Sequence, residues 1–431
     1  MSGVRDLFFD EFYAELETAM ESYVNNEDET SEPPRLADEL ANRWHPYLPG
    51  DRNTGEALVS VDGGVQISRF AYGGFVAVAR ACALAHAPGE GRRLTKAVKI
   101  HIQEVYDNRD RGFIPGYARM ISEYRAAAGA AREVLDRGQK PVVLMDGSLY
   151  LGRFPYATRE YRHHPALITE LLDSISDLRA LARDHEFPLL GISKDSSVFY
   201  LHMELLKAAL VRAGHPRLRA LVDDASSPFD LSLKLGVMEE QDRRALEPFL
   251  DKRPLCDSAL VHFCAESEGY TQPLLLAPSL YRSGSEGIAL YKRLERNLPR
   301  ETADTVTTSL KHFFTNPPVA VSYWKPTPAS RPFRVDIAGH SLGRIEPWGS
   351  SGGNALLEAP DHGALEGVMD QLHHWYCNDV EYNVPMKQAD ILAHFDRNLY
   401  TTKYEPFIIS RLERAGVNVK GTRRNLREMG A

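Results

Sequence analysis

The sequence contains little cysteine and no long apolar run. Its 431 residues include four cysteines, which are too scattered for a disulfide framework or a CxxC zinc motif. No segment approaches the roughly 20 apolar residues that a membrane-spanning helix needs. Residues 1–10 lack the basic start and apolar core of a signal peptide. We therefore expect a cytoplasmic protein with reduced thiols.

Two common catalytic motifs are absent or stand in an unsuitable context. The sequence has no GxxxxGK[ST] loop, so we expect no ATP hydrolysis by this chain alone. Gly339 to Gly343 matches the GxSxG pattern, but Pro347 and Gly349 follow where a helix should begin. No glycine-rich oxyanion segment accompanies it. We interpret this segment as a turn rather than as the nucleophile of an esterase.

Charge is distributed unevenly along the chain. The net charge of −8 at first argues against a nucleic-acid partner. However, residues 1–34 hold ten acids and one base, whereas the remainder holds 50 bases and 49 acids. Residues 403–431 hold seven bases and three acids. A near-neutral body with a basic end can still bind a phosphate backbone.

The N-terminal segment predicts an amphipathic helix that is separate from the main domain. Apolar residues recur at helical spacing between acids from Leu7 to Tyr23. Such a helix either docks on its own domain or forms an arm for a partner subunit. A polar linker at residues 25–34 follows. We divide the chain into a helix and linker (1–50) and a main domain (51–431).

The main domain begins with three strands and continues with alternating helices and strands. The predicted order β-β-β-α-β-α-β-α fits a mixed sheet with helices on its faces. The strands are expected at 57–70, with a turn or bulge at Gly63-Gly64, and at 74–86, 95–105, 141–149 and 188–194, and the helices at 117–137, 165–185 and 197–213. An additional C-terminal α+β portion is expected to have strands at 259–264, 319–324 and 333–337 and helices at 362–377, 387–395 and 404–415.

Two aspartates stand in apolar strands in the same local context. Asp62 lies in Val-Asp-Gly-Gly and Asp146 in Met-Asp-Gly-Ser. A carboxylate in such a strand is costly to bury unless it is paired or binds a metal. Adjacent strand ends would bring both carboxylates to one divalent cation, and hard oxygen ligands suit Mg²⁺ or Mn²⁺. Two such ions stabilise the attacking and leaving oxygens of a phosphodiester.

With these motifs, residues 58–395 resemble the NurA family of DNA-end-processing nucleases, which have an RNase H-like fold. The resemblance rests on Val61-Asp-Gly-Gly, Asp146-Gly-Ser-Leu, Gly191-Ile-Ser-Lys-Asp-Ser, Phe333-Arg-Val-Asp and the segment 382–390. It implies a metal-dependent deoxyribonuclease with endonuclease and 5′–3′ exonuclease activity on single-stranded DNA, in end resection and double-strand break repair. It also implies Mn²⁺ or Mg²⁺, in two sites, a homodimer, and a hexameric HerA-type ATPase that feeds in DNA.

The resemblance implies that Asp62 and Asp146 are metal ligands, together with a glutamate on the helix before Asp146. Glu123 and Glu133 are the two candidates, and Glu123 matches the family context better. At about 100° per residue, their side chains point about 80° apart on a helix. We therefore expect only one of them to face the metals.

The fourth ligand position departs from the family. The family motif has a histidine eight residues after its tyrosine, and here that position is Asp390. An aspartate also binds these ions and favours Mg²⁺ relative to an imidazole. His394, one helical turn later, is a weaker candidate. Asn383 also replaces the family's proline, so an inactive DNA-binding or scaffold subunit is the alternative interpretation.

Two more residues are candidates for substrate contact. Lys194 follows a predicted buried strand, where it would hold the scissile or a neighbouring phosphate. The alternative is an ordinary exposed lysine. Tyr382 would stack on a base or position a phosphate, and the alternative is packing in the interior.

Overall fold

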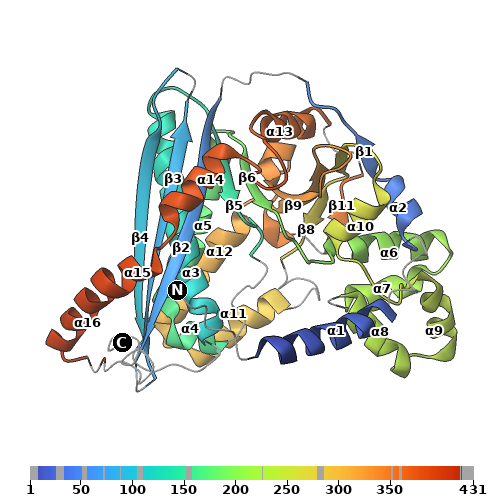
Figure 1. The fold of residues 1–431 in the computed structure, drawn as a ribbon, viewed down its shortest axis with the longest axis horizontal. Helices are drawn as coiled ribbons and strands as arrows, with labels where there is room; N and C mark the ends of the chain where they lie inside the picture. Colours follow the sequence, from blue (N-terminus) through green and yellow to red (C-terminus); the bar gives the residue numbers. More distant parts are fainter. Residues whose placement is uncertain are drawn as a thin grey trace.

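Eleven strands in the described part of the chain form one mixed sheet, shown in Figure 1. The computed structural model describes residues 8–25, 34–50, 56–70, 73–87, 89–103, 110–151, 158–225, 227–278, 286–350, 353–358, 362–417 and 419. The strands are β1 (Trp44–Pro46), β2 (Ala57–Arg69), β3 (Phe75–His86), β4 (Arg93–Gln103), β5 (Pro141–Asp146), β6 (Leu189–Ser193), β7 (Gly269–Thr271), β8 (Leu274–Leu276), β9 (Val319–Lys325), β10 (Phe333–Ala338) and β11 (Ala355–Leu356).

The strand order across the sheet is β1-β7-β9-β10-β6-β5-β2-β3-β4, with β8 beside β9 and β11 beside β8. The neighbours β2, β3 and β4 are antiparallel, and β5 and β6 run parallel to β2. The next strand, β10, is antiparallel to β6. The carboxyl ends of β5 and β6 therefore lie at one edge of the sheet, beside the middle of the longer strand β2.

Helices cover both faces of this sheet. They are α1 (Phe9–Asn25), α2 (Ala37–Ala41), α3 (Asp110–Leu135), α4 (Thr158–His163), α5 (Pro165–Asp184), α6 (Tyr200–Arg212), α7 (Arg219–Asp223), α8 (Pro228–Lys234), α9 (Glu240–Leu246), α10 (Asp257–Cys264), α11 (Glu286–Asn297), α12 (Arg300–Thr315), α13 (His362–His374), α14 (Val384–Ala393), α15 (Arg397–Leu399) and α16 (Glu405–Arg414). None of the helices described is long and apolar enough to cross a membrane.

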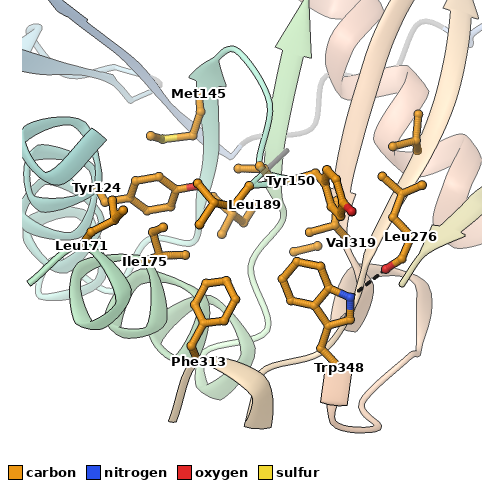
Figure 2. Close-up of a cluster of buried hydrophobic side chains, with 14 of the residues drawn as sticks. Tyr124, Met145, Tyr150, Leu171, Ile175, Leu189, Leu276, Phe313, Val319 and Trp348 are labelled. Atoms are coloured by element: carbon orange, nitrogen blue, oxygen red, sulfur yellow. Dashed lines mark hydrogen bonds between the residues drawn. The ribbon is translucent and has the colours of Figure 1, made fainter. Parts of the chain in front are cut away.

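The apolar run of β5 explains its place in the middle of the sheet. Val143 and Met145 pack into the cluster that contains residues of α3, α5 and α12, while Val142 and Leu144 pack into the cluster of α13. Because successive side chains of a strand point to opposite faces, such a run is buried on both sides. Figure 2 shows the first cluster, in which the Trp348 indole donates a hydrogen bond to Leu276 O at 2.7 Å.

The expected mixed α/β sheet is confirmed, and its β-β-β-α-β-α-β-α order runs from β2 to α6 with the short α4 added. Two local expectations are wrong. No turn interrupts β2 at Gly63-Gly64, because the strand pairs with β3 from Leu58 to Arg69. Residues 259–264 belong to α10 rather than to a strand. The buried residues Asp257, Leu260 and Val261 follow helical spacing there, which a short apolar run does not distinguish from a strand.

The N-terminal helix is present, but its apolar face is not covered. In α1, Phe9, Phe12, Leu16 and Met20 are each at least 40% exposed, so the expectation that it docks on its own domain through this face is wrong. Its role as an arm stays a prediction. The expected linker lies almost wholly outside the described residues. By contrast, β1 pairs with β7, so α2 and β1 pack with the main domain. Both elements lie before residue 50, where the main domain was expected to begin.

Candidate active site

Asp62 and Asp146 lie side by side on neighbouring parallel strands. In the register of β2 and β5, Val61 is opposite Met145, and each aspartate is the next residue. Asp62 is only 8% exposed, and its Oδ1 accepts a hydrogen bond from Gly63 N at 2.7 Å. Burial, and next the charge of Asp146, raise the pKa of Asp62 to about 7. The sheet therefore brings together the two aspartates that the sequence singles out.

Glu123 on α3 reaches the same place from the face of the sheet. Its side chain is nearly buried, and its Oε1 accepts no hydrogen bond from the described residues. Arg119 Nε lies 3.4 Å from that atom. Burial raises the pKa of Glu123 to about 7, with Arg119 opposing the rise and Asp146 adding to it. A buried, poorly satisfied carboxylate of this kind is a strong candidate for cation binding.

The alternative glutamate lies elsewhere. Glu133 is exposed two to three turns further along α3, where its Oε1 accepts a hydrogen bond from Thr95 Oγ1 at 3.2 Å. Its charge is not among those that shift the pKa of Asp62. Of the two candidates, the structure brings only Glu123 to the aspartates.

The helix α14 supplies the fourth carboxylate. It packs across β2 and β3, as Figure 1 shows, and its N-terminus is capped by Asn383 Oδ1, which accepts from Met386 N at 3.0 Å. Asn383 thus has a structural role at the position where a proline was expected. Asp390 is exposed, but it is near enough for its charge to raise the pKa of Asp62. The charges of all three other predicted carboxylates therefore raise the pKa of Asp62.

The two predicted substrate residues have different outcomes. Lys194 Nζ lies 3.2 Å from Asp146 Oδ2, and the lysine side chain is 39% exposed. Tyr382 is 1% exposed, and its ring packs against Phe333 with centroids 5.0 Å apart. The expectation that Tyr382 stacks on a base is therefore wrong, because the ring is part of the interior. Its burial, and next the charge of Asp146, raise the pKa of the Tyr382 hydroxyl well above its usual range.

The donor set suits a hard divalent cation, although no ready coordination shell is present. Within the described residues, no three acidic, histidine or cysteine side chains are placed to hold one ion. Instead, Lys194 contacts Asp146 and Arg119 contacts Glu123. All the candidate donors are carboxylate oxygens, the ligands that Mg²⁺ and Mn²⁺ accept. A bound cation would relieve the repulsion that raises the pKa of Asp62.

Sequence reasoning overlooked Arg119. This residue precedes Glu123 by four positions, the spacing at which side chains of a helix meet. That spacing was the signal available in the sequence. Its guanidinium and the Lys194 ammonium give the site two partly exposed cations beside its four carboxylates.

Comparisons with known proteins found a family model and a solved structure that match this chain. A family model described as the NurA domain matches residues 56–344. Among solved structures, the NurA nuclease from Sulfolobus solfataricus is similar over 96% of this chain and 98% of that one, with a TM-score of 0.50 and 13% identity. At this identity the likeness shows a shared fold. No curated protein matches the chain significantly. The matched range includes Asp62, Glu123, Asp146 and Lys194 and ends before Asp390.

Proposed function

The chain belongs to the NurA family, and from this premise we propose that it is a metal-dependent deoxyribonuclease. The observation that carries the proposal is the convergence of Asp146, Glu123 and Asp390 on the buried Asp62. Four carboxylates are costly to assemble without countercharge, so such a cluster favours a cation site. The order β4-β3-β2-β5-β6, with β5 and β6 parallel to β2, supports an RNase H-like core.

Mn²⁺ or Mg²⁺, in two sites, would be held by Asp62, Glu123, Asp146 and Asp390. When bound, such ions supply Lewis-acid stabilisation of the oxygens that attack and leave the phosphorus. The Lys194 ammonium, released from Asp146, then binds a non-bridging phosphate oxygen. Arg119, released from Glu123, offers a second cation to the DNA backbone. The metal ions would thus replace Lys194 and Arg119 as partners of the carboxylates, and the two side chains would pair with phosphate groups of the DNA.

The substrate we propose is single-stranded DNA at exposed ends, cut endonucleolytically and in the 5′–3′ direction during double-strand break repair. The lack of a P-loop motif means that any ATP-driven movement of DNA requires another protein. A hexameric HerA-type ATPase fits that requirement. The exposed apolar face of α1 supports a homodimer or a contact with that ATPase.

A cleavage assay tests this function. Purified full-length chain is incubated with end-labelled single-stranded DNA and Mn²⁺ or Mg²⁺, in parallel with Asp62→Asn and Asp146→Asn. We expect cleavage by the wild type and a loss of at least a hundredfold in both variants, with Glu133→Gln as the unaffected control. Binding of DNA without cleavage in either metal would overturn the proposal.

That outcome would instead support an inactive DNA-binding or scaffold subunit. Asp390 motivates this second candidate, because it replaces the family's histidine and is exposed to solvent. The lack of a preformed three-ligand group among the described side chains also favours it. Retained DNA binding in Asp62→Asn would be common to both functions, so only cleavage separates them.

A further inference from the structure

A buried ion pair on β10 has no part in the function proposed so far. Arg334 and Asp336 are 4% and 1% exposed. The guanidinium donates from Nε to Asp336 Oδ1 at 2.8 Å and from Nη2 to Oδ2 at 3.1 Å. Burying two charges costs free energy that their attraction only partly returns. An interior pair of this kind therefore calls for a role beyond stability.

The remaining hydrogen bonds of this pair go to the loop that follows Asp146. Ser148 Oγ donates to Asp336 Oδ2 at 2.5 Å, and Tyr150 N donates to the same oxygen at 3.1 Å. Arg334 Nη2 lies 3.2 Å from Ser148 Oγ, as a further donor to it. Asp336 thus accepts hydrogen bonds from two residues of the loop. The Ser148 hydroxyl contacts both Asp336 and Arg334.

The same loop is also attached to β6. Gly147 N donates to Ile192 O at 2.7 Å. The approach is close, because a Cβ on Gly191 would stand 2.5 Å from Gly147 O. In the antiparallel register of β10 and β6, Asp336 is opposite Gly191. Asp336 therefore lies beside β6, the strand to which both β5 and the loop are hydrogen-bonded.

We propose that Asp336 and Arg334 are positioning residues that act through Ser148 to hold the Asp146 carboxylate beside Asp62. The inference rests on the proposed function. Two forces act against this placement, since Asp62 repels Asp146 and Lys194 attracts it. A carboxylate subject to both forces needs a fixed backbone to stay beside Asp62. The bonds of the loop to β10 provide that restraint.

Ser148→Ala is the sharpest test, because it removes the hydroxyl that contacts both charged groups and leaves the ion pair and the Tyr150 N bond to Asp336 in place. Asp336→Asn would leave Arg334 buried without its countercharge, and such a variant risks not folding. Ser148→Thr keeps the hydroxyl and serves as the conservative variant. Ser322→Ala is the matched control, because the Ser322 Oγ is also buried in the sheet and donates to Thr271 O at 2.7 Å, away from the loop.

Three readouts are measured on the full chain: kcat and KM for single-stranded DNA, Mn²⁺ affinity by calorimetry, and amide hydrogen exchange. For Ser148→Ala we expect kcat and Mn²⁺ affinity to fall by about tenfold or more, with KM within about twofold, and faster exchange in residues 147–150. Ser148→Thr should recover most of both losses. Wild-type kcat and Mn²⁺ affinity in Ser148→Ala, or equal losses in Ser322→Ala, would overturn the positioning role.

Failure of the proposed function gives a different result. In that case the wild type itself neither binds Mn²⁺ nor cleaves DNA, whatever Ser148 does. Hydrogen exchange then decides the inference alone. Faster exchange of the loop in Ser148→Ala than in Ser322→Ala supports the restraint, and unchanged exchange refutes it.

Discussion

Gly63 and Glu123 touch across the interface of β2 and α3, so closely that a Cβ on Gly63 would lie 2.7 Å from both Cγ and Oε1 of the glutamate. The missing side chain is what allows Glu123 to reach Asp62. Gly64 has a similar role on the other side, since a Cβ there would lie 2.8 Å from Ala393 O at the end of α14. The glycine pair thus makes room for the two helices that bring carboxylates to Asp62.

Gly63→Ala should displace Glu123 and weaken the site. We expect a loss of about 1–3 kcal/mol in unfolding free energy, from overpacking, and a clear fall in cleavage rate. Urea unfolding and the end-label assay measure the two effects. Gly91→Ala is the control, since no atom lies within 4 Å of a Cβ built there. Wild-type stability in Gly63→Ala would show that the contact is easily relieved.

The stability of the metal-free protein should depend on the protonation of Asp62 and Glu123. Both pKa values are raised to about 7 in the folded chain, so the folded state binds protons that the unfolded state has released. The resulting penalty is absent below about pH 4, grows as the pH rises to 7, and is complete above 7. Asp62→Asn should remove the part of this penalty that Asp62 contributes, on the order of 4 kcal/mol at pH 8.

The measurement is the melting temperature of wild type, Asp62→Asn and Glu133→Gln between pH 4 and pH 8 without divalent metal. Only Asp62→Asn should become more stable than wild type as the pH rises. If the three curves run parallel, the pKa of Asp62 is not raised in the folded chain as described. Added Mn²⁺ should raise the melting temperature of the wild type most.

Asp390 should set the metal preference if it is a ligand. Asp390→His restores the imidazole that the family has, so we expect activity to shift from Mg²⁺ towards Mn²⁺. Asp390→Ala should lose about tenfold or more in rate with either ion. Cleavage rates across both metals provide the comparison. Near-full activity of Asp390→Ala would refute a ligand role.

Lys194 is expected to weaken metal binding and to strengthen DNA binding. Its ammonium lies 3.2 Å from Asp146 Oδ2, so it competes with a cation for that carboxylate. Lys194→Ala should therefore raise Mn²⁺ affinity modestly while increasing KM for DNA. Calorimetry and steady-state kinetics measure the two, with the exposed Lys311→Ala as control. A variant in which neither quantity changes would leave Lys194 as an ordinary surface lysine.

The apolar face of α1 should control association. Phe12 and Leu16 are 61% and 40% exposed, so changing both to serine removes apolar contact area without disturbing the core. In the proposed homodimer, we expect the double variant to dissociate by light scattering at an unchanged melting temperature. Val237→Ser alters a residue that is 87% exposed elsewhere and should keep the wild-type mass. An unchanged mass in the double variant would place the dimer contact elsewhere.

Much of the sheet and half of the carboxylate cluster follow from local pattern. Asp62 and Asp146 stand out because each interrupts an apolar strand, and that signal needs no knowledge of neighbouring elements. The strands β2, β3 and β4 are long, whereas β5 is a short apolar run that ends at Asp146 itself. Residues 259–264 are different, because a short apolar run fits a buried helix as well as a strand. Its assignment depended on what packs around α10.

Residue order thus established the strands β2 to β6, the two aspartates and the family resemblance, since each rests on a run of neighbouring residues. Tertiary packing decided between Glu123 and Glu133, placed Tyr382 in the interior, and removed the turn expected at Gly63. It also joined the Asp146 loop to Asp336, which is far away in the chain. The reason is geometric: periodicity orients a side chain relative to its own helix or strand, whereas the position of that element against its neighbours depends on contacts between distant segments.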